Sequence, residues 1–182
     1  MCLLGTHRVG KTSLRRRFMG SRFKKNYMPT VGSDFSYLER FIDGEKYRLL
    51  IWDLAGETKF KNVRSLYFQG AFGAIVVFDL TNRESFLDLE NWIKEIEEIT
   101  PTGGIPFYIV GNKYDLLLDS NDQEMSDAEI EDLIHKLKEQ FGGKFEIGFI
   151  KSSAKSGMNV DSLFEELVRN IMIWLPNRKN MK

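Results

Sequence analysis

The stretch that most constrains the fold is residues 5–12, GTHRVGKT, which follows the short apolar run CLL and precedes a helix-forming stretch. It matches G-x-x-x-x-G-K-[ST], whose glycines let the backbone curl until its N–H groups surround a phosphate. The pattern assigns Lys11 to the β- and γ-phosphates and the hydroxyl of Thr12 to Mg²⁺. The alternative, a glycine turn with a structural lysine, is disfavoured because the loop stands between a strand and a helix. A nucleotide-binding α/β protein is therefore expected.

Apolar runs alternate with helical patterns along the rest of the chain, which predicts a doubly wound α/β domain. Residues 35–54 form two alternating runs that meet at Asp43-Gly44, a favoured hairpin turn. In folds of this class, ligands lie at the carboxyl ends of the strands. A short buried strand is indicated by residues 2–5, and strands buried on both faces by the continuous apolar runs 74–80 and 106–112. Residues 146–155 are interpreted as a last strand and the loop that follows it.

Helices are expected between these strands. One covers residues 11–20, and its basic run 15–17 reads as a solvated face. The last helix is expected to stop at Pro176, because proline cannot continue a helix, so that a C-terminal tail begins at about 176. A helix that ends near residue 101 has an apolar face made of Leu87, Trp92, Ile93 and Ile96.

Composition narrows the class of protein. With 42% hydrophobic and 29% charged residues, the 182 positions read as one globular domain, residues 1–182. Lys plus Arg and Asp plus Glu both number 26, so no overall charge points to nucleic acid. Cys2 is the only cysteine, which excludes a disulfide framework and suits a reducing cytosol. No apolar window reaches the ~18 residues of a membrane span. A cytoplasmic monomer is expected.

The segment IVGNKYD indicates which base is bound. Asp115 follows a buried strand closely, and its carboxylate can accept hydrogen bonds from the ring N–H and the exocyclic amine of guanine, whereas adenine offers no matching donors. Taken alone, Asp115 would be interpreted as a helix cap; after a phosphate loop, guanine is the better interpretation. The segment Ser153-Ala154-Lys155 fits as the backbone donor to guanine O6.

The segment WDLAG supplies the third part of the site. Asp53, at the end of a strand, can hold Mg²⁺ through a water molecule, and the N–H of Gly56 can reach the γ-phosphate. The alternative role of Asp53 as a turn former is disfavoured, because the upstream loop needs a metal partner.

Five short motifs occur in order: GTHRVGKT, YMPT, DLAG, NKYD and SAK. With them the chain resembles the Ras superfamily of small GTPases, and most closely its Rab branch, whose marks include PTVGSDF, LLIWDLAGE, YFQGA and VVFDLTNRESF. The resemblance implies a three-layer P-loop G domain, a mostly parallel six-stranded sheet with one antiparallel edge strand and about five helices. It also implies a switch that binds GTP or GDP with Mg²⁺, hydrolyses GTP slowly, and works with an exchange factor, an activating protein and effectors.

The resemblance also implies roles for individual residues. Thr30 would complete the Mg²⁺ shell when the γ-phosphate is present, Tyr27 would close over the phosphates, and Phe23 would pack against the guanine edge. Catalysis is attributed to Lys11, Gly56 and a water molecule oriented near Glu57. The implied nucleotide contacts are, in chain order, His7, Arg8, Val9, Gly10, Lys11, Thr12, Ser13, Phe23, Tyr27, Thr30, Gly56, Asn112, Lys113, Asp115, Ser153, Ala154 and Lys155.

Phe35, Trp52 and Tyr67 match the three aromatic residues with which Rab proteins meet their effectors. The alternative is that each is aromatic filler between a hairpin and a helix. As a set that flanks the switch segments, they favour a partner surface.

Glu57 stands where the family normally has glutamine. A glutamine amide can accept a hydrogen bond from the attacking water and donate one to a phosphate oxygen, whereas an ionised Glu57 can only accept. Hydrolysis is expected to survive with a changed rate. The direction stays open, because the loss of a donor argues for slower hydrolysis and a better water acceptor argues for faster hydrolysis.

His7 and Arg8 form the middle of the loop. By resemblance, the third loop position, which is His7 here, faces the γ-phosphate, and the family usually has glycine or another small residue there. Large side chains there should narrow the space for an activating protein's arginine finger, which is worth roughly 10³–10⁵ in rate. Two alternatives remain open for the pair. Either both side chains lie on the rim in solvent, or Arg8 or protonated His7 supplies part of that charge in cis.

Both ends of the chain depart from the family pattern. Only residues 1–4 precede the loop, and a shortened first strand is expected to reduce stability at the sheet centre. The C-terminal segment PNRKNMK has no cysteine for a lipid, so membrane contact is expected only indirectly or through a missing tail. Two other functions stay open: a non-hydrolysing GTP-binding scaffold, and a P-loop kinase or ATPase, which NKYD opposes.

Overall fold

The computed structural model describes residues 1–23, 30, 32–56, 66, 68, 70–100, 104–119, 125–141 and 146–178. At its centre is a six-stranded sheet with the order β2-β3-β1-β4-β5-β6. Neighbouring strands run parallel except for the pair β2 and β3, which confirms the predicted antiparallel edge strand. The strands are β1 (Cys2–Leu4), β2 (Ser33–Ile42), β3 (Glu45–Leu54), β4 (Ala74–Asp79), β5 (Phe107–Asn112) and β6 (Ile147–Lys151).

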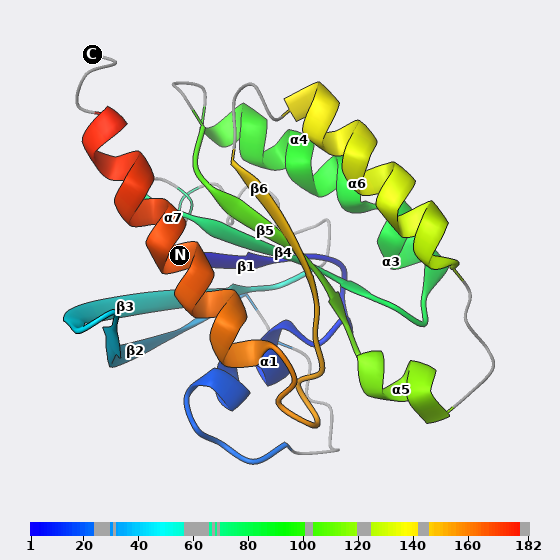
Figure 1. Ribbon diagram of the computed structural model, residues 1–182, viewed down its shortest axis with the longest axis horizontal. Coiled ribbons are helices and arrows are strands. Elements are labelled where there is room, and N and C mark those ends of the chain that lie inside the picture. The colour runs from blue at the N-terminus through cyan, green and yellow to red at the C-terminus, as the bar shows by residue number, and fades with distance from the viewer. Residues whose placement is uncertain are drawn as a thin grey trace.

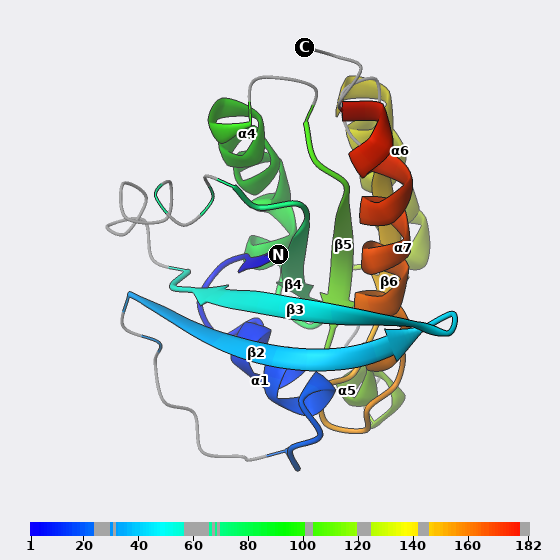
Figure 2. The same ribbon diagram turned by 90° about the vertical axis from the view of Figure 1, so that its left-hand side faces the viewer.

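The hairpin of β2 and β3 forms where the sequence predicted it, and Figure 2 looks onto it at the edge of the sheet. Asp43 and Gly44, at its turn, have φ angles of 51° and 83°. Two consecutive left-handed residues make the turn whose twist matches that of the two strands. The register pairs Phe35 with Trp52 at the other end of the hairpin. β3 also pairs with β1, so the end of β3 lies beside the phosphate loop.

Helices cover both faces of the sheet, which confirms the three-layer prediction. α1 (Lys11–Phe18) and α7 (Val160–Arg178) lie on one side, and α3 (Arg83–Leu87), α4 (Leu89–Ile99) and α6 (Asp127–Phe141) on the other (Figure 1). The short α5 (Tyr114–Asp119) follows β5. Successive residues of the central strands serve opposite faces: Leu3 and Ile75 pack toward α7, while Leu4 and Val76 pack toward α4. These strands are therefore apolar at successive positions, up to the polar residues Asp79 and Asn112 that end β4 and β5.

The helices differ from the sequence predictions at three points. Leu87 is 61% exposed because α3 ends there, and the buried face of α4 begins instead at Leu89. Pro176 does not stop α7, which runs to residue 178; near the end of a helix, proline gives up only one backbone hydrogen bond. Arg15 is only 4% exposed, so the basic run 15–17 is not a uniform solvated face. None of the described helices combines the length and apolar character needed to cross a membrane.

Candidate nucleotide site

The loop between β1 and α1 depends on two glycines. Gly5 has a φ of 128°, and a Cβ there would lie 2.1 Å from the carbonyl oxygen of Val77. Gly10 has a φ of 102°, and its Cβ would lie 2.2 Å from Nδ2 of Asn112. Each position combines left-handed backbone with a contact that leaves no room for a side chain, so glycine is required at both.

His7 and Arg8 form the middle of this loop, and both side chains are exposed. Arg8 has a φ of 63°, whereas the next residue, Val9, is buried and faces the core. The exposure agrees with placement on the rim. It is equally compatible with charge supplied in cis, because a bound phosphate would also lie outside the protein surface.

Lys11 and Gly56 approach the loop from two directions. Nζ of Lys11 donates to the carbonyl oxygens of Gly5 at 2.5 Å and Thr6 at 2.8 Å, so its ammonium group lies against the loop. Gly56 follows the end of β3, and a Cβ there would lie 2.5 Å from the oxygen of Gly5 and 2.6 Å from the nitrogen of His7. A cation and a close-lying backbone segment thus flank the predicted phosphate position.

Three oxygen-bearing side chains from separate segments meet next to Lys11. Oγ1 of Thr12 donates to Oδ2 of Asp53 at 2.5 Å and lies 3.1 Å from Oγ1 of Thr30. The structure therefore brings together all three residues that the sequence assigned to the metal.

The chemistry of this cluster fits Mg²⁺. Asp53 is fully buried, and its Oδ1 has no hydrogen-bond partner among the described residues. Burial raises the pKa of Asp53, and the hydrogen bond from Thr12 and the charges of Arg15 and Lys11 oppose this effect. Hydroxyl and carboxylate oxygens suit a hard cation, and a buried carboxylate oxygen without a partner is satisfied by a cation or by its water shell.

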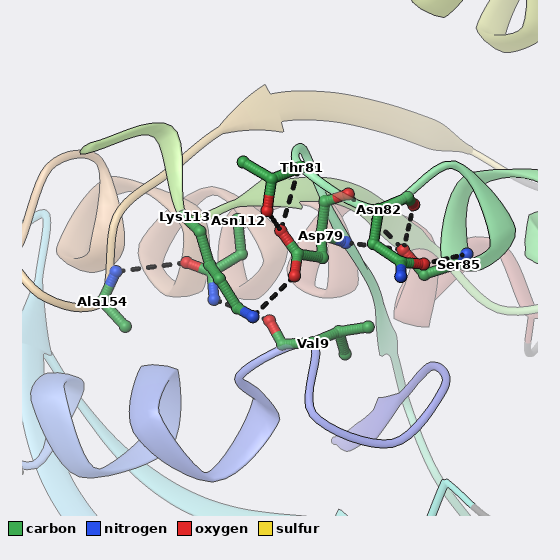
Figure 3. Close-up of polar contacts among 8 residues, drawn as sticks. All are labelled: Val9, Asp79, Thr81, Asn82, Ser85, Asn112, Lys113 and Ala154. Carbon is green, nitrogen blue, oxygen red and sulfur yellow. Dashed lines mark hydrogen bonds and ion pairs between the residues drawn. The ribbon is translucent and has the colours of Figure 1, made fainter. Parts of the chain in front are cut away.

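At the base end, Asn112 holds three loops together. Its Nδ2 donates to the carbonyl oxygen of Val9 at 2.8 Å, and its Oδ1 accepts the N–H of Ala154 at 3.1 Å (Figure 3). Asn112 is 1% exposed, so both bonds are shielded from water. The phosphate loop, the loop after β5 and the loop after β6 are thereby fixed relative to one another.

Asp115 is positioned by residues of the loop after β6. It accepts a hydrogen bond from Oγ of Ser153 at 2.5 Å, and Nζ of Lys155 lies 3.3 Å from its other oxygen. The sequence placed these residues at one site but did not indicate that they bind one another. The signal was their position after two buried strands, whose carboxyl ends lie side by side in a parallel pair.

Sequence reasoning missed Asp79, which pairs with Lys113 at 2.6 Å (Figure 3). Oδ1 of Asp79 accepts from the N–H and the hydroxyl of Thr81, at 2.9 and 2.8 Å. The N–H of Asp79 donates to Ser85, whose hydroxyl also contacts the carbonyl oxygen of Asn82. The signal available in the sequence was an aspartate that ends an apolar run, as Asp53 does.

A second missed contact joins the phosphate loop to the opposite layer. Oγ1 of Thr6 donates to Oδ2 of Asp88 at 3.0 Å and lies 3.4 Å from Nε1 of Trp92. Asp88 lies between α3 and α4, so the break that exposes Leu87 also places this carboxylate beside the loop.

The remaining predicted residues are placed in part. Phe35 and Trp52 face the same side of the hairpin, with ring centroids 5.1 Å apart, and Phe35 is 57% exposed. Phe23 is 40% exposed. Ser13 lies in the first turn of α1, half-buried. The predictions for Tyr27, Glu57 and Tyr67 fall outside the described residues.

Comparison with known proteins gives a consistent result. The family model described as Ras family matches residues 1–173. Ras-related protein Rab-13 of Mesocricetus auratus is 35% identical over 180 residues, which cover 99% of this chain and 83% of that protein. Rab-13 of Bos taurus is 37% identical over 174 residues, which cover 95% of this chain and 79% of that protein. Ras-related protein Rab-8B of Homo sapiens is 37% identical over 180 residues, which cover 99% of this chain and 81% of that protein. The similarity thus extends over nearly the whole chain.

Proposed function

This chain belongs to the Ras family of small GTPases, and we propose that its nucleotide site is the set of loops at the carboxyl ends of β1, β3, β5 and β6. Proteins of this family bind GTP or GDP with Mg²⁺, and the chain is a GTP-hydrolysing switch of the Rab-like type. The observation that carries the assignment is the meeting of Thr12, Thr30 and Asp53 beside the glycine loop.

At the base end, Asp115 would accept the two hydrogen bonds that guanine donates. Its two oxygens already contact Ser153 and Lys155, so the carboxylate is held in place before the base arrives. The segment of Ser153, Ala154 and Lys155 would supply the backbone donor to guanine O6. The N–H of Ala154 donates to Oδ1 of Asn112 in this structure, so it would have to turn to the base to act as that donor. A base without the matching donors would cover these oxygens and leave their remaining acceptor sites without a hydrogen bond, which would account for selectivity against adenine.

At the phosphate end, Lys11 and the loop N–H groups would bind the β- and γ-phosphates. Thr12 and Thr30, and Asp53 through a water molecule, would hold Mg²⁺, which would neutralise charge on the phosphates. Gly56 would donate its N–H to the γ-phosphate. In the hydrolysis step, water attacks the γ-phosphorus, the bond to the β-phosphate oxygen breaks, and phosphate and GDP leave. Glu57 would orient this water as an acceptor.

The switch follows from how the two γ-phosphate contacts are connected. The N–H of Ala55 donates to the carbonyl oxygen of Gly32 at 2.9 Å, which joins the segment after Thr30 to the segment before Gly56. Loss of the γ-phosphate would release both anchors together. The change would reach the adjoining end of the hairpin, where Phe35 and Trp52 offer an aromatic surface to effectors of a trafficking or signalling pathway.

The nucleotide that remains bound through purification tests the proposal. We expect denatured protein to release a guanine nucleotide, and we expect a thousandfold excess of ATP to fail to displace labelled GDP, within the 10⁴–10⁵ range of hydrogen-bonded selectivity. Single-turnover phosphate release from GTP then measures hydrolysis for wild type and Glu57→Gln. Equal rates would remove Glu57 from the mechanism, and displacement of GDP by ATP would contradict the guanine site.

The role of the loop's middle is tested separately. In a variant with both His7→Gly and Arg8→Gly, a slower intrinsic hydrolysis would support charge supplied in cis. An unchanged intrinsic rate would place both side chains on the rim. The response of the same variant to an arginine-bearing activating protein then shows whether their bulk narrows the entry.

A further inference from the structure

Arg15 is a buried arginine within a basic run. It is 4% exposed, whereas the neighbouring Arg16 is exposed. Arg15 lies one helical turn after Lys11 on α1. The guanidinium of Arg15 points toward the β2–β3 hairpin. Nη1 donates to Oγ of Ser36 at 2.9 Å, and Nη2 donates to Oδ2 of Asp34. The side chain therefore joins α1 to the first residues of β2.

The third nitrogen of Arg15 faces the metal site. Nε lies 3.9 Å from Oδ2 of Asp53, the same oxygen that accepts the hydrogen bond from Thr12. In the described part of the chain, Nε of Arg15 and Oδ1 of Asp53 are the two buried side-chain polar atoms without a hydrogen-bond partner. A guanidinium, which is always charged, therefore lies within ion-pair range of the carboxylate assigned to Mg²⁺.

We propose that Arg15 is a counter-ion built into the metal site, which lowers the affinity of the site for a divalent cation and so raises the Mg²⁺ concentration needed to retain the nucleotide. This inference rests on the proposed function, because it takes Thr12 and Asp53, joined by Thr30 when the γ-phosphate is present, as the Mg²⁺ site. It assigns Arg15 a positioning and tuning role, without contact to the substrate.

The effect of Arg15 on the metal is electrostatic. A divalent cation beside Asp53 is attracted by the carboxylate and repelled by the guanidinium. Because Arg15 and Asp53 are both buried, solvent and salt screen this repulsion far less than they would at the surface. In the metal-free protein the same guanidinium compensates part of the desolvation of Asp53, so it stabilises the carboxylate when the cation is away.

Asp34 determines how much of the guanidinium charge acts on Asp53. Its carboxylate is 57% exposed and pairs with Nη2 of Arg15, and this hydrogen bond holds the pKa of Asp34 below its ordinary value. Asp34 is therefore ionised and shares the positive charge of Arg15. If Asp34 were neutral, the whole charge of Arg15 would face Asp53, and the metal would bind less tightly.

The test measures the free Mg²⁺ concentration at which half of a fluorescent GDP analogue is retained, with Mg²⁺ set by chelator buffers. In Arg15→Met, which keeps an unbranched side chain but no charge, we expect this concentration to fall about tenfold, in line with removal of one buried charge. Arg16→Met removes the same charge from an exposed neighbour on the same helix. Because that charge is screened by solvent, we expect a shift of about twofold at most.

Asp34→Asn should act in the opposite sense and raise the half-retention Mg²⁺ concentration. If Arg15→Met fails to fold, Arg15→Gln takes its place, because its amide can still donate to Ser36 or Asp34 while carrying no charge. The counter-ion role requires that a neutral residue at position 15 strengthens Mg²⁺ binding and that Asp34→Asn weakens it.

Two outcomes would overturn the inference. If the neutral variants at 15 need as much Mg²⁺ as wild type, the guanidinium does not act on the metal. If these variants and Asp34→Asn all need more, Arg15 anchors β2 instead of balancing charge. Failure of the proposed function would look different, because wild type itself would then release GDP at the same rate at every Mg²⁺ concentration.

Discussion

The two ends of the nucleotide site differ in how completely the protein satisfies its own polar groups. At the base end, Asn112 is bonded on both sides, and Asp115 contacts Ser153 and Lys155. At the metal end, Asp53 keeps a buried oxygen without a hydrogen-bond partner among the described residues. The base end is thus organised by the protein alone, whereas at the metal end Arg15 balances the charge of Asp53 only in part, and an added cation would complete that balance.

This difference explains where a switch can be placed. A region whose hydrogen bonds are internally satisfied has one stable arrangement, so it can recognise guanine in both nucleotide states. A region that needs the ligand's charge can change when the γ-phosphate leaves. The hairpin end that carries Phe35 and Trp52 adjoins the second region, through the bond between Gly32 and Ala55.

The largest effect is expected from altering the base end. Asp115→Asn keeps the shape of the side chain but replaces one acceptor with a donor, so GTP affinity should fall about a hundredfold or more. Xanthosine triphosphate, which has an acceptor in place of the exocyclic amine, should gain affinity. Competition against labelled GDP measures both. Asp161→Asn, an exposed aspartate on α7, is the control, and an equal loss there would show that the effect is not specific to the base.

Substitutions at two glycines test the contact through which Asn112 joins the base end to the phosphate loop. Gly10→Ala would place a methyl group 2.2 Å from Nδ2 of Asn112, whereas Gly20→Ala has nothing within 4 Å, although both have positive φ. We expect Gly10→Ala to lower the free energy of unfolding by about 3 kcal/mol, from strain and the broken bond to Val9. Gly20→Ala should lower it by about 1 kcal/mol, from backbone strain alone. Urea unfolding compares the two, and equal losses would deny that Asn112 couples the ends.

At the metal end, one substitution should change the stability of the nucleotide-free and the ligand-bound protein in opposite directions. Asp53→Asn removes a charge whose burial is unfavourable enough to raise the pKa of Asp53, while Arg15 keeps its ion pair with Asp34, so the substitution should stabilise the nucleotide-free protein by about 1 kcal/mol at pH 7. With Mg²⁺ and GDP present it should destabilise the protein, because ligand binding is weakened. Urea unfolding with and without Mg²⁺ and GDP gives both values. Destabilisation in both states would mean that Asp53 is fully satisfied without the metal.

The pKa of Asp53 gives the same test a pH dependence. Because the folded-state pKa is raised above the ordinary value, the folded protein takes up this proton first. Nucleotide-free protein should therefore gain stability from this group as the pH falls through the raised pKa toward the ordinary one. It should lose that gain as the pH rises. Asp53→Asn should remove this component of the pH profile.

The smallest effect is expected from the contact between the loop and the opposite layer. Thr6→Val keeps the shape of the side chain but removes its bonds with Asp88 and Trp92, so the free energy of unfolding should fall by about 1 kcal/mol. GDP affinity should change by less than about threefold, because neither end loses a residue that contacts the ligand. A large loss of affinity would show that this contact shapes the phosphate loop.

The sequence was most informative where local chemistry decides the outcome. The pair Asp43-Gly44 predicts the hairpin turn from backbone preference alone. The segment Gly10-Lys11-Thr12 predicts a phosphate loop, in which the backbone at position 10 requires glycine. The sequence also assigned Thr12 and Asp53 to one metal site. The two residues meet because Thr12 follows β1, and Asp53 lies at the end of β3, the neighbour of β1 in the sheet.

The sequence was least informative where one residue's environment depends on distant partners. Arg15 and Arg16 are the same residue type in one basic run, so the sequence does not distinguish them. Only Arg15 is buried, in contact with Asp34, Ser36 and Asp53. Leu87 matched an apolar face by spacing, but the break at Asp88 changed the helical phase. In each case the deciding contact joins segments that are far apart or differently oriented, which a periodicity cannot show.

Amide hydrogen exchange, compared between nucleotide-free protein and protein with Mg²⁺ and a non-hydrolysable GTP analogue, tests the contrast between the two ends most directly. We expect β5 and β6 to be protected already in the nucleotide-free protein, with the large gain on binding confined to α1 and to residues 32–36 and 51–56. Fast exchange throughout β5 and β6 before binding, or an equal gain at both ends, would contradict the account.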